Sequence, residues 1–164
     1  MNNVHYSSET NEWATPEDVY LALHREFDFT LDPCCTHDNA KCERHFTLTE
    51  DGLSRDWGRE IVFMNPPYGR EIILWMQKAY ESSLKGATVV CLVPARTDTK
   101  WWHDFAMNGE IRFLRGRIKF KGPDTLHRFM ASKTTSAPFP SAVVVFRPHN
   151  SVISRIEIGE KYEL

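Results

Sequence analysis

Residues 61–68, Ile61-Val62-Phe63-Met64-Asn65-Pro66-Pro67-Tyr68, decide the fold class of this 164-residue chain. Four apolar residues in a row are typical of a strand that is covered on both faces of a sheet. The strand ends abruptly, because two successive prolines lack backbone N–H groups and fix their φ angles. A polar turn directly after a buried strand predicts a ligand site at the carboxyl edge of a parallel sheet.

Helix and strand patterns alternate on both sides of this stretch. Before it, a helix is expected from Thr15-Pro16 to about Asp28, with Thr15 as its cap, and a strand at 29–31 that runs into Asp32-Pro33. After it, we expect helices at 70–84 and 99–107, and strands at 87–93, 111–114, 118–120 and 142–146. Segments 34–58 and 121–140 are predicted as loops. This order predicts an α/β fold with a mostly parallel central sheet flanked by helices.

The length is that of a single domain. We expect a flexible N-terminus at 1–12, the domain at 13–149, and a C-terminal tail or edge strand at 150–164. The longest apolar run, 89–93, is too short to span a bilayer, and the first residues lack the pattern of a secretory leader. The four cysteines do not suggest a disulfide framework, so a cytoplasmic protein with reduced thiols is expected.

The net charge of −2 hides a basic segment. Residues 94–149 carry ten Lys and Arg against four Asp and Glu, whereas residues 1–93 carry eight against fifteen. A basic segment on a mildly acidic chain is a candidate surface for a polyanion, although a solvated face without a partner gives the same pattern. If nucleic acid binds there, we expect phosphate contacts from Arg96, Lys100, Arg115, Arg117 and Lys119.

We expect the substrate of Asn65-Pro66-Pro67-Tyr68 to be a flat base whose exocyclic amine is the nucleophile. The lone pair of such an amine is delocalised into the ring, so a site must accept hydrogen bonds from it. The side-chain oxygen of Asn65 and the carbonyl of Pro66 offer two acceptors, which the prolines hold in place. Tyr68 offers a face for a base flipped out of a duplex, where stacking recovers about 1–3 kcal/mol. The alternative is a rigid proline turn with Tyr68 packed nearby.

This tetrapeptide matches the [Asp/Asn/Ser]-Pro-Pro-aromatic motif of amino-group DNA methyltransferases. More narrowly, the chain resembles the compact phage and prophage DNA N6-adenine methyltransferases, the Dam-type family. The resemblance covers most of residues 13–147 and includes Trp13-Ala14-Thr15-Pro16, Phe29-Thr30-Leu31-Asp32, Asp51-Gly52-Leu53, Asp56-Trp57, residues 92–98 and residues 139–142. It implies a Rossmann-like fold, S-adenosylmethionine as cofactor, double-stranded DNA as partner, and methylation of adenine at N6. It also suggests a role in protecting phage DNA from restriction.

The resemblance further implies which residues hold the cofactor. Trp13, Thr15 and Pro16 match the N-terminal cofactor-contacting segment of the family. Asp32-Pro33 is similar to the acidic turn that holds the methionine end, although the glycine of that turn is missing. Asp56 falls where members contact the adenine end, and Asn65 completes the set. The structural alternatives are a helix cap with a buried Trp at 13–16, a turn carboxylate at Asp32 and a strand-end carboxylate at Asp56.

Other functions stay open from the residues alone. The tetrapeptide also serves methylation of cytosine N4, RNA adenine or protein glutamine, and a non-catalytic DNA-binding module of this fold is a further alternative. A structural zinc site is the third, but the soft ligands here lack Cys-x-x-Cys spacing, so no metal is expected. Those residues are Cys34, Cys35, His37, Cys42 and His45.

The tryptophans and the motif spacing complete the predictions. Trp75, Trp101 and Trp102 are expected chiefly as core residues rather than as base-stacking ones. The segment between Asp32 and Asn65 leaves no room for a separate recognition domain. Target recognition is therefore expected from residues 96–140, from the tail, or from a second subunit in a homodimer.

Overall fold

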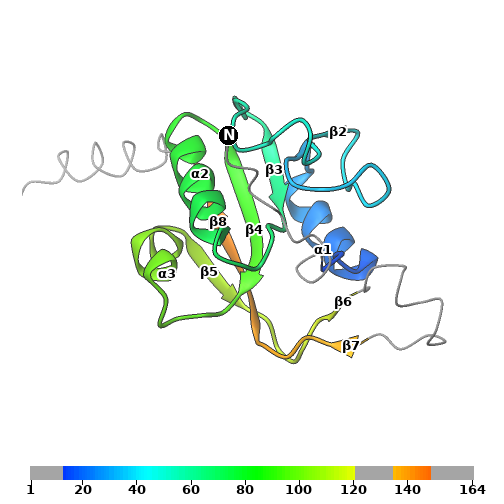
Figure 1. Ribbon diagram of the computed structural model, residues 1–164, viewed down its shortest axis with the longest axis vertical. Coiled ribbons are helices and arrows are strands. Elements are labelled where there is room, and N and C mark those ends of the chain that lie inside the picture. The colour runs from blue at the N-terminus through cyan, green and yellow to red at the C-terminus, as the bar shows by residue number, and fades with distance from the viewer. Residues whose placement is uncertain (1–12, 121–134, 149–164) are drawn as a thin grey trace, which may run out of the picture.

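The structure is a computed structural model that describes residues 13–120 and 135–148. The predicted flexible N-terminus and C-terminal tail or edge strand lie outside the described residues. A six-stranded sheet forms the centre of the molecule, with the strand order β2-β1-β3-β4-β8-β5 (Figure 1). The strands are β1 (Leu31–Asp32), β2 (Arg44–His45), β3 (Ile61–Met64), β4 (Thr88–Pro94), β5 (Glu110–Phe113) and β8 (Ser141–Phe146).

Three of the five pairings in this sheet are parallel, which confirms the predicted mostly parallel sheet. The last strand, β8, inserts antiparallel between β4 and β5. A separate antiparallel ribbon consists of β6 (Lys119–Phe120) and β7 (Thr135–Ser136). It lies beyond the end of β4, at the lower right of Figure 1. Because successive parallel strands all end at one edge, residues after β1 and β3 are brought together.

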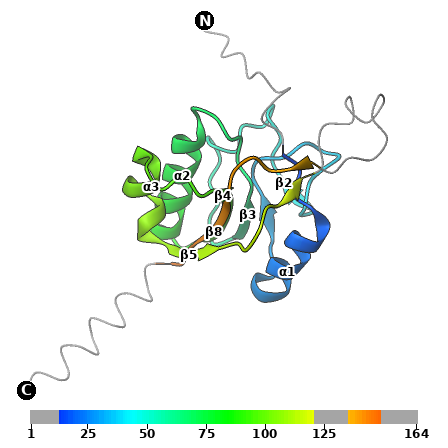
Figure 2. The same cartoon turned by 90° about the horizontal axis from the view of Figure 1, so that it is seen from below.

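Helices cover both faces of the sheet (Figure 2). The helix α1 (Glu17–Phe27) packs on one face, and α2 (Ile72–Leu84) and α3 (Lys100–Asp104) cover the other, followed by a 3₁₀ turn at Ala106–Asn108. Strand β3 shows why its run is apolar throughout. Val62 and Met64 belong to the core beneath α2, whereas Phe63 belongs to the core beneath α1. Among the helices that the structure describes, none is long and apolar enough to cross a membrane.

The differences from the predicted elements are local. Two-residue strands occur within both segments that were predicted as loops, namely β2 and β7. Strands this short have no visible period, and their pairing depends on neighbours distant in the sequence. The cap of α1 is Pro16, not Thr15, and no side chain caps that helix. The hydroxyl of Thr15 is used elsewhere, because it contacts Asn65.

Candidate functional site

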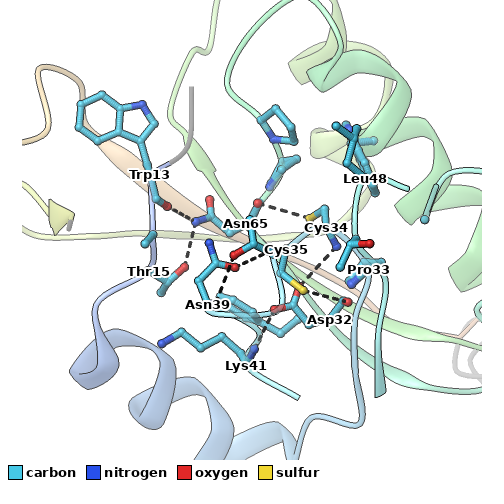
Figure 3. A pocket seen from close by; sticks show the side chains of 18 of the residues that line it. Trp13, Thr15, Asp32, Pro33, Cys34, Cys35, Asn39, Lys41, Leu48 and Asn65 are labelled. Atoms are coloured by element: carbon cyan, nitrogen blue, oxygen red, sulfur yellow. Dashed lines mark hydrogen bonds between the residues drawn. The ribbon is translucent and has the colours of Figure 1, made fainter. Parts of the chain in front are cut away.

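A cavity of about 1040 Å³ opens at the carboxyl ends of β1 and β3 (Figure 3). This volume lies at the upper end of the range for small-molecule sites. We call it the first cavity. Seven of the residues predicted from the sequence contribute to its lining, namely Trp13, Thr15, Asp32, Pro33, Asn65, Pro66 and Pro67. The structure thus brings together the N-terminal segment, the turn after β1 and the turn after β3.

The side chain of Asn65 is hydrogen-bonded at both ends of its amide group. Its Nδ2 donates to the carbonyl oxygen of Trp13 at 2.6 Å and to Oγ1 of Thr15 at 2.9 Å (Figure 3). Its Oδ1 accepts a hydrogen bond from the Tyr68 hydroxyl at 2.7 Å. The acceptor oxygen therefore points away from the N-terminal segment, toward Tyr68.

Tyr68 contacts two aromatic rings through its own ring and a backbone carbonyl through its hydroxyl. Its ring packs edge-to-face against Phe120, at 6.1 Å between ring centroids, and against Phe139, at 5.5 Å. Its hydroxyl is also within 3.2 Å of the Leu92 carbonyl. Burial raises the pKa of Tyr68 well above its ordinary value, so this hydroxyl stays protonated and acts as a donor.

Tyr68 also lines a second cavity of about 340 Å³, together with Pro94, Arg96, Lys100 and Trp101. Gly69 and Arg70 border both cavities. The segment 65–70 is therefore the wall between the first cavity and the second cavity. A group held in the first cavity faces one side of this wall, and a flat ligand beside Tyr68 faces the other.

Asp32 organises the turn after β1. Its carboxylate accepts backbone hydrogen bonds from Lys41 at 3.0 Å and from Cys34 at 3.4 Å (Figure 3). Only 3% of Asp32 is exposed, and burial raises its pKa, against the lowering effect of these two hydrogen bonds. The thiol of Cys34 donates to the backbone carbonyl of Asn65 at 3.4 Å, which links the two turns. The alternative of a turn carboxylate thus describes the contacts that Asp32 makes.

Asp51 and Gly52 line the first cavity, although the sequence suggested no site role for them. Asp51 has a φ of 51°, a left-handed conformation that is rare for a residue with a side chain. A Cβ on Gly52 would lie 2.0 Å from the carbonyl oxygen of Pro33. The only signal in the sequence was the Asp51-Gly52-Leu53 segment of the family resemblance.

Two predicted cofactor contacts do not line the cavity. Asp56 is exposed, and its carboxylate accepts a hydrogen bond from the backbone N–H of Gly58 at 2.9 Å. Pro16 caps α1 and is also absent from the lining. The acidic residue from this part of the chain that lines the cavity is Asp51, five positions earlier.

The predicted DNA-contacting cations fall into two groups. Arg96 and Lys100 line the second cavity, where Lys100 pairs with Asp104 and the Arg96 guanidinium lies 6.0 Å from the centre of the Phe139 ring. The other three, Arg115, Arg117 and Lys119, are exposed at and before β6 and line neither cavity. Arg70, which was not predicted, borders both cavities.

The segment rich in Cys and His shows no metal arrangement within the described ranges 13–120 and 135–148. No group of three or more His, Cys, Asp or Glu side chains is placed to hold an ion there. His37 and His45 instead bond to one another at 2.9 Å. The three tryptophans weighed for base stacking, Trp75, Trp101 and Trp102, are buried in the core as expected.

We expect the cysteines of the native protein to resist alkylation. Burial raises the pKa of Cys42 to about 11, and burial also raises the pKa of Cys34 and Cys35 above the ordinary range. Because a raised pKa lowers the fraction of reactive thiolate, iodoacetamide at pH 8 should modify Cys42 roughly 100-fold more slowly than an ordinary thiol. Mass spectrometry of native and urea-unfolded samples measures this, and equal rates in the two states would contradict the half-buried placement of Cys42.

The α/β sheet, the cavity at its carboxyl edge and the Asn-Pro-Pro-Tyr wall together define a Rossmann-like methyltransferase. More narrowly, the chain belongs to the DNA N-6-adenine-methyltransferase (Dam) family, whose model matches residues 3–164. The match extends beyond the predicted domain bounds of 13–149 at both ends. The predicted family and the adenine-specific class of enzyme are thereby confirmed.

Individual proteins agree with this placement. The DNA N-6-adenine-methyltransferase of Haemophilus phage HP1 is 28% identical, over 94% of this chain and 92% of that protein. That of Escherichia phage T1 is 31% identical over 98 residues, which are 58% of this chain and 41% of that protein. A solved structure of a candidate RNA methyltransferase from Pyrococcus horikoshii aligns with a TM-score of 0.51 and 12% identity, over 84% of this chain and 86% of that one. The structural likeness shows the fold alone.

Proposed function

We propose that the wall between the two cavities carries out the N6-adenine methylation that family membership assigns to this chain. In this proposal the first cavity holds S-adenosylmethionine, and the target adenine, flipped out of double-stranded DNA, stacks on Tyr68 in the second cavity. The observation that carries the proposal is the placement of Asn65. Its side chain lies in the wall, and its acceptor oxygen is turned toward Tyr68.

The polar groups of the first cavity fit an amino-acid end and a ribose. Asp32 offers a buried carboxylate that suits an ammonium group. Thr15 offers a hydroxyl hydrogen for which the described part of the chain contains no acceptor, and this donor suits a carboxylate. Asp51, in place of Asp56, offers a carboxylate to ribose hydroxyls. Trp13, Pro33 and Asn65 complete the proposed contacts. The cofactor supplies a methyl group that its sulfonium charge has already activated.

The hydrogen bond between Tyr68 and Asn65 supports a binding position for the amine of the base beside Oδ1 of Asn65. The Tyr68 hydroxyl donates to Oδ1 of Asn65 at 2.7 Å, and an adenine amine would make the same kind of contact. The base must therefore displace this hydroxyl. The Pro66 carbonyl is the proposed second acceptor, and the two together make the nitrogen lone pair available for attack. In the proposed transfer, the amine nitrogen would gain a bond to the methyl carbon as the sulfur–carbon bond breaks, and the nitrogen would release one proton to solvent.

The cations beside the second cavity are proposed to bind the DNA backbone. Replacing Arg96 by Gln should weaken binding and lower the slope of log affinity against log salt by about 0.9, because one phosphate contact is lost. Fluorescence anisotropy with a labelled duplex at several salt concentrations measures this slope. Arg25→Gln is the matched control, since Arg25 is exposed on α1 and lines neither cavity. An unchanged slope in Arg96→Gln would remove Arg96 from the proposed interface.

The substrate class is tested by offering the protein three acceptors with methyl-labelled S-adenosylmethionine. These are unmethylated duplex DNA, RNA of the same sequence and a mixture of unrelated proteins. We expect label in DNA. Label confined to RNA or to protein would contradict the proposed substrate. Failure to bind the cofactor in a calorimetric titration would contradict the assignment of the first cavity.

A further inference from the structure

The amide of Asn65 has two ends of nearly equal size, and only one of them suits the proposed chemistry. The oxygen can accept a hydrogen bond from an adenine amine, whereas the NH₂ group, being a donor, would repel it. Something must therefore fix the orientation of this amide before the base arrives. The inference that follows rests on the proposed function of Asn65.

The carbonyl oxygen of Trp13 sets the orientation of the amide. It lies 2.6 Å from Nδ2 of Asn65 and carries no hydrogen, so it can only accept. A flipped amide would place two oxygens 2.6 Å apart with no hydrogen between them. Trp13 is itself held by its ring, which packs against Phe120 at 5.6 Å and Phe139 at 6.0 Å between centroids.

Thr15 takes up the second N–H of the same amide. Its Oγ1 lies 2.9 Å from Nδ2 of Asn65, and only 5% of the residue is exposed. With both N–H groups bound, the oxygen is the end that remains for a substrate. The Tyr68 hydroxyl donates to this oxygen, a contact that agrees with the direction set by the Trp13 carbonyl.

We propose that Trp13 and Thr15 are positioning residues, which fix the orientation of the Asn65 amide so that its oxygen faces the substrate amine. This role is distinct from a contact with the cofactor, although a hydroxyl can serve both. The Thr15 hydroxyl accepts a hydrogen bond from Asn65 through a lone pair, and its own hydrogen remains free to be donated to the cofactor. Thr15 therefore matters to turnover even when the cofactor is saturating.

Thr15→Val tests this positioning role, because valine keeps the branched shape of threonine and removes the hydroxyl that accepts from Asn65. At saturating cofactor and DNA we expect kcat to fall about ten- to 100-fold, since one N–H of the partly buried amide loses the acceptor that helps to orient it, while KM for DNA stays within about twofold. Thr15→Ser keeps the hydroxyl and should restore kcat to within about threefold of the wild type. The matched control is Thr88→Val at the opposite, amino end of β4, which should leave both parameters unchanged.

Hydrogen exchange of the Asn65 side-chain NH₂ group is a second measurement, which does not require activity and can be made on the wild type itself. In the wild type, the side-chain NH₂ protons of Asn65, assigned by their loss in Asn65→Ala, should exchange slowly with solvent. Exchange should accelerate in Thr15→Val and remain slow in Thr15→Ser. Fast exchange in the wild type would overturn the inference.

The outcomes separate this inference from the proposed function. If Asn65→Ala retains full activity, the proposed function of Asn65 fails, whatever the exchange rates show. If Asn65→Ala is inactive but Thr15→Val keeps the wild-type kcat, the positioning role of Thr15 is overturned and the proposed function of Asn65 is not. A drop in kcat for Thr15→Val that Thr15→Ser does not restore would also overturn the positioning role, because the hydroxyl would then not be the cause.

Discussion

Asn65→Ala should lower the rate of methyl transfer by about 100- to 1000-fold, the cost of removing one aimed polar group at a reacting centre. The variant loses the acceptor oxygen that faces Tyr68 and keeps only the Pro66 carbonyl. Because the loss concerns the reacting amine, it should appear in the single-turnover rate at saturating DNA and cofactor. Rapid quench with labelled cofactor measures that rate.

Two controls separate chemistry from folding. Asn65 makes three hydrogen bonds through its side chain, so the melting temperature of the variant must be measured alongside the rate. Asn108→Ala is the matched substitution, since among the described residues the Asn108 amide bonds only to backbone carbonyls near the end of α3. A folded Asn65→Ala protein with a rate within tenfold of the wild type would show that Asn65 is not the acceptor.

Gly52→Ala should destabilise the protein by about 3 kcal/mol and abolish cofactor binding, the upper range for adding a methyl group to a packed site. The added Cβ would lie 2.0 Å from the Pro33 carbonyl oxygen and 3.3 Å from the Trp75 ring. The new Cβ is fixed to the Gly52 backbone and meets the backbone carbonyl of Pro33. Rotation of a side chain therefore cannot relieve the clash. The turn at Pro33, which lines the first cavity, would have to move.

Urea unfolding and calorimetric titration with S-adenosylhomocysteine measure both effects. Gly58→Ala is the control, because Gly58 has a φ of 54° and no atom within 4 Å of an added Cβ. That substitution carries only the backbone cost, about 1–2 kcal/mol, and Gly58 does not line the cavity. If Gly52→Ala proves as stable as Gly58→Ala and binds the ligand normally, the close approach at Pro33 is wrong.

The sequence predicted those parts of the fold whose pattern is local. The apolar run of β3 is visible because both faces of that strand are buried, and the two prolines mark its end. The predicted bounds of α2 and β4 agree with the structure to within about two residues, the usual precision of such boundaries. By contrast, β2 has two residues and depends on its pairing with β1. No local pattern indicated that β8 would insert antiparallel.

The candidate site was predicted where a motif ends a strand. Asp32 and Asn65 were predicted in this way, and both line the first cavity. Asp51 was missed because it reaches the cavity through a left-handed turn rather than from a strand end. The cap role predicted for Thr15 was wrong for a similar reason. Its hydroxyl bonds to a residue fifty positions away, a contact that only the folded sheet creates.

The role of Asn65 in adenine methylation is tested most directly by identifying the nucleoside that receives the methyl group. Unmethylated duplex DNA is incubated with methyl-deuterated S-adenosylmethionine and either wild-type protein or Asn65→Ala, then digested and analysed by mass spectrometry. We expect deuterated N6-methyladenine with the wild type and almost none with the variant. Deuterated N4-methylcytosine, or equal N6-methyladenine from both proteins, would contradict this expectation.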